Sequence, residues 1–213
     1  MEWFASEVGR LHENCYLLCD FTDKQALIVD PGDQFNRIRE AVYACGVTPL
    51  AVLLTHAHFD HIGALEDVRS FWNIPVYMQQ MEAEWLGDPK KNGSAYFAFV
   101  PDLAARPADY LLTDQQQQLT IGSFSMQLLR TPGHSPGGIS YYFAKEQVVF
   151  CGDTLFRGNI GRSDSLGGKT DELLATITER LMTLPEETVV CPGHGPATTI
   201  AAEAATNPFL VGK

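Results

Sequence analysis

Four apolar segments of this chain end in short turns that carry histidine or aspartate, and this feature constrains the fold most. Residues 51–54 (AVLL) lead into THAHFDH at 55–61, and later segments lead into PGHS at 132–135, CGD at 151–153 and CPGH at 191–194. These turns hold five of the six histidines. Strand ends are where a rigid scaffold usually presents reactive groups, so we expect a fold that brings the four turns together.

The residue types in these turns are those that bind divalent metal ions. In an extended segment alternate side chains face the same way, so His56 and His58 can point at one atom while Asp60 and His61 reach a second point nearby. Imidazole and carboxylate ligands suit Zn²⁺, Fe²⁺ and Mn²⁺. A lone histidine in a turn is usually structural, as we expect for His12, but the repeated context favours a metal centre. The predicted ligands are His56, His58, Asp60, His61, His134, Asp153 and His194.

Hydrophobic periodicity predicts an α/β fold. Apolar positions at spacings of three and four predict helices around 38–45, 62–72 and 173–181, the last with Thr170 as its N-cap. Strands broken by helices in two comparable halves favour two sheets packed face to face with helices outside. Strands are predicted near residues 2–8, 14–19, 25–29, 50–54, 75–78, 118–121, 124–129, 139–143, 147–151 and 187–191.

Composition excludes several classes of protein. The 213 residues are 45% hydrophobic and 19% charged, which predicts one compact domain. No apolar run approaches the roughly 18 residues of a membrane span and the N-terminus lacks a secretory pattern, so we expect a cytoplasmic protein with no membrane partner. Five cysteines without a CxxC spacing predict free thiols. The net charge of −11 argues against a nucleic-acid partner, because phosphate contacts draw on clustered Lys and Arg.

Residues 87–109 form a long segment rich in Gly, Pro and Asn, with Tyr96, Phe97 and Phe99 near its centre. A loop of this length is often a lid or a binding wall. It is equally expected that residues 87–109 form a loop packed on the surface without a role in binding.

The motifs HxHxDH at 56–61, TPGHSPGG at 131–138, CGDTLF at 151–156 and GHGP at 193–196 together resemble the metallo-β-lactamase superfamily. The resemblance spans nearly the whole chain and implies a single αββα sandwich domain over 1–213, with two mixed β-sheets and a dinuclear site. It implies one metal held by His56, His58 and His134, a second held by Asp60, His61 and His194, and Asp153 as the bridge. The expected cofactors are two divalent ions per chain, Zn²⁺ first, with Fe or Mn as alternatives.

Within the superfamily, GDTLF followed by a Gly-rich segment is similar to the glyoxalase II branch, the hydroxyacylglutathione hydrolases, in the short bacterial form without a C-terminal helical glutathione-binding domain. That branch cleaves S-D-lactoylglutathione to D-lactate and glutathione in methylglyoxal detoxification. Its usual Lys or Arg followed by Tyr is represented here by Arg162 and Asp164. Arg162, Arg157 and Lys169 are therefore candidates for contacting a glutathione thioester, or each is an exposed cation.

The implied mechanism is attack on an acyl carbon by a hydroxide formed between two cations, which lower the pKa of water toward about 7. Asp60 would bind metal and orient the proton of this hydroxide. A thiolate leaves without a proton donor, which favours a thioester over a lactam, and Asp153 also weighs against a lactamase. Alternatives are a mononuclear iron persulfide dioxygenase, a hydrolase of another small thioester or ester, and a non-catalytic relative. Thiolate ligation by Cys151 or Cys191 is less favoured than simple burial.

Overall fold

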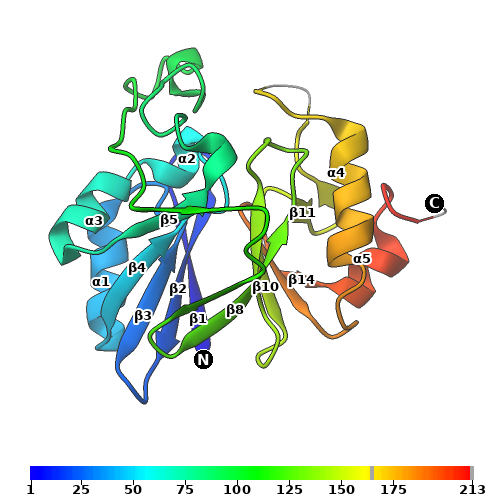
Figure 1. Cartoon of the computed structure of the whole chain (residues 1–213), viewed down its shortest axis with the longest axis horizontal. Helices are drawn as coiled ribbons and strands as arrows, with labels where there is room; N and C mark the ends of the chain where they lie inside the picture. The colour runs from blue at the N-terminus through cyan, green and yellow to red at the C-terminus, as the bar shows by residue number, and fades with distance from the viewer. Residues whose placement is uncertain (164–165, 212–213) are drawn as a thin grey trace.

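The computed structural model describes residues 1–163 and 166–211, and two six-stranded sheets face each other at its centre (Figure 1). The strands of the first sheet lie side by side in sequence order. They are β1 (Glu2–Val8), β2 (Glu13–Asp20), β3 (Gln25–Val29), β4 (Thr48–Leu53), β5 (Val76–Gln79) and β6 (Tyr110–Leu112). Pairing is antiparallel from β1 to β3 and parallel from β3 to β6, so this sheet is mixed.

The second sheet has the order β14-β13-β10-β9-β8-β7 and is also mixed. Only β10 and β13 pair in parallel among its described strands. The strands are β7 (Gln118–Ile121), β8 (Phe124–Arg130), β9 (Ile139–Phe143), β10 (Val148–Gly152), β13 (Val189–Pro192) and β14 (Thr198–Thr199). A separate hairpin pairs β11 (Leu155–Phe156) with β12 (Asn159–Ile160).

Helices cover the outer face of each sheet, as Figure 1 shows. On the first sheet lie α1 (Phe35–Cys45) and α3 (Leu65–Trp72); on the second lie α4 (Thr170–Thr176), the π-helical turn η3 (Ile177–Leu181) and α5 (Ile200–Thr206). The apolar core therefore has three layers. Ile38 and Val68 pack on the first sheet, Leu53 and Phe150 pack between the sheets, and Leu173 packs on the second.

The sheets are joined at the end that carries the predicted ligands. The Tyr141 hydroxyl donates to the Leu54 carbonyl at 2.7 Å, and the Ile139 N–H donates to the Thr55 carbonyl at 2.9 Å. Both bonds tie the second sheet to the segment that leaves β4. They place residues 55–61 beside the turns of the second sheet.

Most predicted elements are confirmed, with two corrections. The helix expected over 62–72 is two helices, α2 (Phe59–Ile62) and α3, because the backbone leaves helical geometry at Ala64 (φ −103°, ψ 8°), whose N–H donates to the Pro31 carbonyl at 2.9 Å. Thr170 is not the N-cap of α4 but its first residue, and its hydroxyl is 2.7 Å from the Ser163 hydroxyl. Strands β6, β11, β12 and β14 and helix α5 were not predicted.

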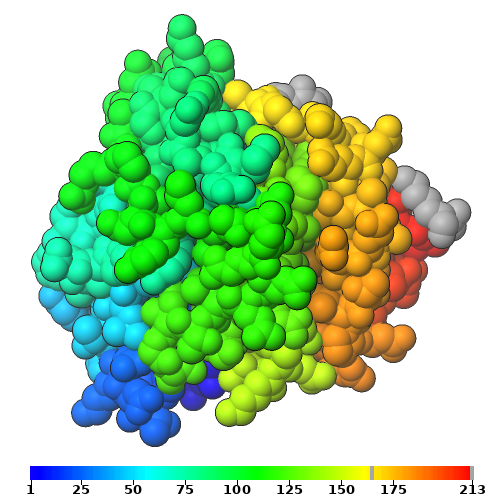
Figure 2. Space-filling model, in the orientation of Figure 1, coloured from blue at the N-terminus to red at the C-terminus, as the bar shows by residue number. Residues whose placement is uncertain are grey.

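Residues 87–109 contain only the short 3-10 helix η2 (Ser94–Tyr96). The segment is fixed to the domain by Asn92, which is fully buried and donates to the Trp85 and Leu103 carbonyls at 3.1 and 2.8 Å. The Asn92 carbonyl accepts from the Phe59 N–H at 3.0 Å. Figure 2 shows this part of the chain as the green and teal projection at the upper left. No helix in the described ranges has the length and hydrophobicity that crossing a bilayer requires.

Candidate metal centre

His56, His58 and His134 form the first of two groups of predicted ligands. The segment after β4 supplies His56 and His58, and the turn after β8 supplies His134. One ligand atom from each residue lies within 4.8 Å of the others. The Nδ1 atom of His58 is 2.8 Å from the Nε2 atom of His134. The structure therefore brings together the three residues expected at one metal.

Asp60, His61 and His194 form the second group, whose ligand atoms also lie within 4.8 Å of one another. Helix α2 carries Asp60 and His61, and the loop after β13 carries His194. The Nε2 atom of His194 is 3.2 Å from Oδ2 of Asp60, and the Nε2 atom of His61 is 4.0 Å from the same oxygen. These are the residues expected at the second metal.

Asp153 lies between the two groups. Its Oδ2 atom is 3.6 Å from Nε2 of His134 in the first group and 3.5 Å from Nε2 of His194 in the second. Its Oδ1 atom is 3.4 Å from Nε2 of His61. Gly193 lies directly against this carboxylate, because a Cβ added at that position would be 2.2 Å from Oδ1. Asp153 thus has the position of a bridging ligand.

The donor atoms of the centre fit divalent ions. Three buried atoms that face the centre have no hydrogen-bond partner within the described residues: Nε2 of His56, Nε2 of His61 and Oδ1 of Asp153. A buried polar atom without a partner costs about 1–3 kcal/mol, and a cation bound among these lone pairs removes that cost. Histidine nitrogens with carboxylate oxygens are the donor set of Zn²⁺ and of neighbouring first-row ions.

Hydrogen bonds to the far ring nitrogens hold four of the histidines. Asp30 Oδ2 accepts from His61 Nδ1 at 2.9 Å, and the carbonyls of Arg162 and Leu11 accept from Nδ1 of His134 and His194 at 2.6 and 3.0 Å. The Thr55 hydroxyl is 3.1 Å from His56 Nδ1. Such partners fix the ring orientation and leave Nε2 to face an ion.

Asp30 was missed by the sequence analysis, although it also follows an apolar strand. Its carboxylate accepts from the Thr55 N–H at 2.8 Å and from the Thr55 hydroxyl at 2.5 Å, in addition to His61. Asp30 could form a third ligand group with His56 and His61. Because its oxygens already accept from these donors, we assign it to the orientation of His61 rather than to a metal.

Glu82, in the 3-10 helix η1 (Gln80–Glu82), joins two ligand turns and was also missed. Its side chain is fully buried, and its two oxygens accept from the N–H groups of Ala57 and Gly137 at 2.7 and 2.6 Å. Ala57 lies between the first two histidines of the centre, and Gly137 lies in the turn of His134. Burial raises the pKa of Glu82, and these hydrogen bonds oppose the rise.

Burial and the neighbouring charges together set the pKa values of the ligand side chains. Burial lowers the pKa of His58 to about 3, with His134 adding to the effect. Burial, with His61 adding to it, also lowers the pKa of His56 well below its usual range. Both rings are neutral near pH 7, which is the form that binds metal. Burial alone would raise the pKa of Asp153, but His61 and the other histidines outweigh it, so the pKa is lowered and the carboxylate is ionised.

The family comparison agrees with this geometry. A model of the metallo-beta-lactamase superfamily matches residues 8–194. The chain belongs to the metallo-beta-lactamase superfamily. The probable metallo-hydrolase YqgX of Bacillus subtilis (strain 168) is 48% identical over 212 residues, which cover 100% of this chain and 99% of YqgX. The hydroxyacylglutathione hydrolase GloC of Haemophilus influenzae is 31% identical over 206 residues, 97% of this chain and 96% of GloC.

Solved structures of the superfamily confirm the predicted fold class. The crystal structure of the BLEG-1 B3 metallo-beta-lactamase matches with a TM-score of 0.95 at 47% identity, covering 99% of this chain and 100% of that one. The structure of TTHA1623 in a di-iron-bound form matches with a TM-score of 0.82 at 37% identity, covering 97% and 100%. The mixed sheets with outer helices are thus the αββα sandwich of the metallo-beta-lactamase superfamily.

Three cations, Arg162, Arg157 and Lys169, are predicted to contact substrate. Arg162 and Arg157 have exposed side chains, and the backbone carbonyl of Arg162 accepts from Nδ1 of His134. Lys169 has a side chain that is 73% exposed and an ion pair with Glu172 at 3.5 Å. Asp164 lies outside the described residues. A substrate role for these cations stays a prediction.

The remaining expectations concern side chains outside the centre. His12 is on the surface as predicted, 72% exposed and 2.8 Å from a Glu7 oxygen. All five cysteines are free thiols. Cys151 and Cys191 are buried and belong to none of the ligand groups found among the described residues, and burial raises the pKa of Cys151 to about 12. These two thiols therefore pack the core.

Proposed function

We propose that this protein is a metal-dependent thioester hydrolase of the hydroxyacylglutathione hydrolase type, which cleaves S-D-lactoylglutathione to D-lactate and glutathione. The observation that carries the proposal is the pair of three-residue ligand groups with Asp153 between them. Its substrate is suggested by the resemblance of GDTLF and its surroundings to the glyoxalase II branch. The similarity to GloC over nearly the whole chain supports the same choice.

The proposed ligands are His56, His58 and His134 at one ion, Asp60, His61 and His194 at the other, and Asp153 at both. When bound, divalent ions at such a centre polarise an acyl oxygen and lower the pKa of water toward about 7. Zn²⁺ is our first choice. Iron is the first alternative because TTHA1623 was solved in a di-iron-bound form, and Mn²⁺ also suits this donor set.

Asp60 is the residue of the chain that we assign to proton handling. Burial alone would raise its pKa, but His61 and His194 outweigh it and lower the pKa, so the side chain is ionised at neutral pH. One oxygen, Oδ2, faces Nε2 of His194 at 3.2 Å. The carboxylate can therefore accept a hydrogen bond from a nucleophilic water and hold it toward the acyl carbon.

The leaving group favours a thioester. The conjugate acid of a thiolate has a pKa of about 8.5, so the sulfur departs near neutral pH without a proton donor. An amide nitrogen requires a proton, and the ligand rings that could supply one have their Nδ1 atoms occupied by Arg162 and Leu11 carbonyls or by Asp30.

Lactam hydrolysis is the second candidate, because a structure 47% identical to this chain is that of a B3 metallo-beta-lactamase. A persulfide dioxygenase, which would use a single iron held by two histidines and an aspartate, is the third candidate. The presence of the whole second group, Asp60, His61 and His194, does not decide against it, because related mononuclear enzymes retain some of those residues.

The test is a substrate panel with the purified protein loaded with Zn²⁺, Mn²⁺ or Fe²⁺. We expect release of D-lactate and glutathione from S-D-lactoylglutathione, faster than hydrolysis of a simple ester or a lactam. Intact S-D-lactoylglutathione with all three metals would overturn the proposal. Oxygen consumption with glutathione persulfide, or faster turnover of the lactam, would select one of the other candidates. Elemental analysis of the protein as isolated identifies the metal.

A cytoplasmic location stays a prediction.

A further inference from the structure

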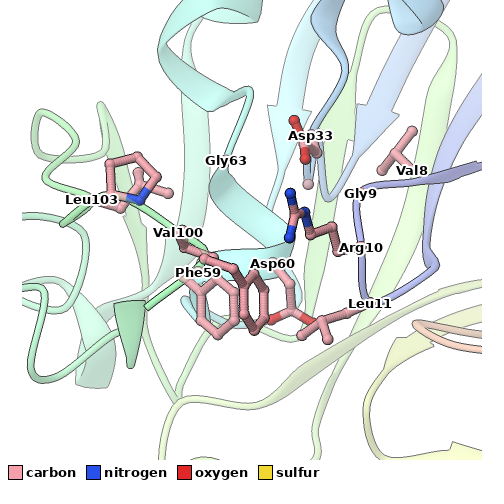
Figure 3. A pocket seen from close by; sticks show the side chains of 13 residues that line it. Val8, Gly9, Arg10, Leu11, Asp33, Phe59, Asp60, Gly63, Val100 and Leu103 are labelled. Atoms are coloured by element: carbon pink, nitrogen blue, oxygen red, sulfur yellow. The ribbon is translucent and has the colours of Figure 1, made fainter. Parts of the chain in front are cut away.

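A pocket of about 230 Å³ lies directly beside the candidate metal centre. It is enclosed by the β1–β2 turn, the loop after β3, helix α2 and the 97–103 part of the 87–109 segment (Figure 3). Asp60 and Leu11 connect the pocket to the metal centre. Each of them lines the pocket, and each also contacts His194. A molecule bound at the metal centre can therefore extend into this pocket.

The walls of the pocket are mostly apolar. The apolar side chains that line it are those of Phe59, Phe99, Val100 and Leu103. The Phe59 ring also packs against the Phe97 ring, with 4.8 Å between the ring centres. At about 30 Å³ for each group the size of water, the volume admits about eight such groups. That is the size of an amino-acid head group with two or three methylenes.

Two opposite charges, Arg10 and Asp33, also line the pocket but do not pair with each other. No ion pair joins Arg10 to a carboxylate within residues 1–163 and 166–211, and the guanidinium carbon lies 5.7 Å from the centre of the Phe99 ring. Asp33 uses Oδ1 to accept from the Gln34 N–H at 2.6 Å, which leaves Oδ2 available. Figure 3 shows the guanidinium between Asp33 and the Phe59–Asp60 segment.

We propose that this pocket binds the zwitterionic amino-acid end of the thiol carrier, with its carboxylate at Arg10 and its ammonium at Asp33. A guanidinium and a carboxylate that face one pocket without pairing match a dipolar group better than a simple anion, because the anion would also meet Asp33. The apolar walls match the methylenes that join such a head group to the thioester. The inference rests on the proposed thioesterase function and assigns to it a carrier of the γ-glutamyl type.

The first test changes the substrate and leaves the protein intact. The metal-loaded enzyme is assayed with lactoyl thioesters of glutathione, of N-acetylglutathione, which lacks the ammonium, and of N-acetylcysteamine, which lacks the whole head group. We expect kcat/KM to fall about 10-fold from the first to the second, a value between those of an exposed ion pair and a buried charged hydrogen bond. It should fall further with the third.

The second test uses Arg10→Ala and Asp33→Asn, the latter retaining the oxygen that accepts from Gln34. Each variant should raise KM for the glutathione thioester about 10-fold with kcat nearly unchanged, because the head group lies away from the reacting bond. Neither should alter turnover of the N-acetylcysteamine thioester. Asp33→Asn should have no further effect on the N-acetylglutathione thioester. The control is Arg37→Ala, an exposed arginine on α1 that does not line this pocket.

The outcomes separate the inference from the function on which it rests. Equal losses on all thioesters would mean that Arg10 and Asp33 are structural, and unchanged kinetics would mean that they do not meet the substrate; either result overturns the inference. Wild-type hydrolysis without preference for glutathione would overturn it too, while the thioesterase function stands. Failure to cleave any thioester would refute the function and the inference together.

Discussion

Gly193 offers the sharpest test of the proposed bridge. A Cβ at this position would lie 2.2 Å from Oδ1 of Asp153 and 2.7 Å from Cε1 of His61, whereas real Cβ contacts essentially never fall below 3.0 Å. The φ angle of Gly193 is not positive, so alanine is permitted by the backbone. Gly193→Ala therefore reduces the space available to the Asp153 carboxylate most, and to the His61 ring beside it.

The size of the effect follows from the displacement. The carboxylate oxygen must retreat by about 1 Å to accept the methyl group. A misplacement of about 1 Å in a catalytic group costs about 100-fold in rate, or about 2.7 kcal/mol of activation free energy. Overpacking lowers the free energy of unfolding by about 1–3 kcal/mol. We therefore expect a large loss of turnover, a reduced metal content and moderate destabilisation.

The assay combines elemental analysis, thioester turnover and urea unfolding. The matched control is Gly87→Ala, where the added Cβ is 3.7 Å from the nearest atom, the Ala105 carbonyl oxygen, and the φ angle is again not positive. This control should keep metal content and turnover, and its stability should be equal or slightly higher. If Gly193→Ala matches the control in all three measurements, Asp153 does not hold the position argued here.

Three further predictions test other parts of the site. Asp153→Ala should abolish both bound metal and turnover, measured by elemental analysis and thioester assay; unchanged turnover would refute the bridging role. Glu82→Ala leaves the Ala57 and Gly137 N–H groups without acceptors, so urea unfolding should show a loss of about 2–6 kcal/mol, with a smaller loss for Glu82→Gln; an unshifted midpoint would contradict this. Because burial raises the pKa of Cys151 to about 12 and the thiolate is the reactive form, mass spectrometry should find it unalkylated by iodoacetamide at pH 8 until guanidinium is added. Rapid alkylation of Cys151 itself in the native protein would disprove its burial.

The sequence predicted what depends on local pattern. Apolar runs and the turns after them located His56, His134 and His194 at strand ends, because periodicity and turn residues act within a few positions. Asp30 carries the same signal, an apolar strand followed by Asp-Pro-Gly, and could have been found. Glu82 could not, since nothing in QQMEAEW indicates that its carboxylate is buried between two distant turns.

Tertiary contacts explain the other differences. The helical periodicity of 62–72 continues through Ala64, and the helix breaks there because the Ala64 N–H donates to the Pro31 carbonyl of a distant loop. Strand β14 has two residues and β6 has three, too few for a periodic pattern. The pocket of Arg10 and Asp33 depends on three loops meeting, which the spacing of residues does not reveal.

The spread of the proposed ligands along the chain governs when metal can be acquired. His56 is followed about 140 residues later by His194, so a ribosome working at about 5–20 residues per second needs roughly 7–30 s to pass from one to the other. During the first part of that interval the nascent chain holds three of the proposed ligand histidines and an aspartate without their partners from the second half. The group of His56, His58 and His134 can be completed well before the chain ends, but the group of Asp60, His61 and His194 cannot. A metal at the proposed second site can therefore be bound only by a nearly finished polypeptide.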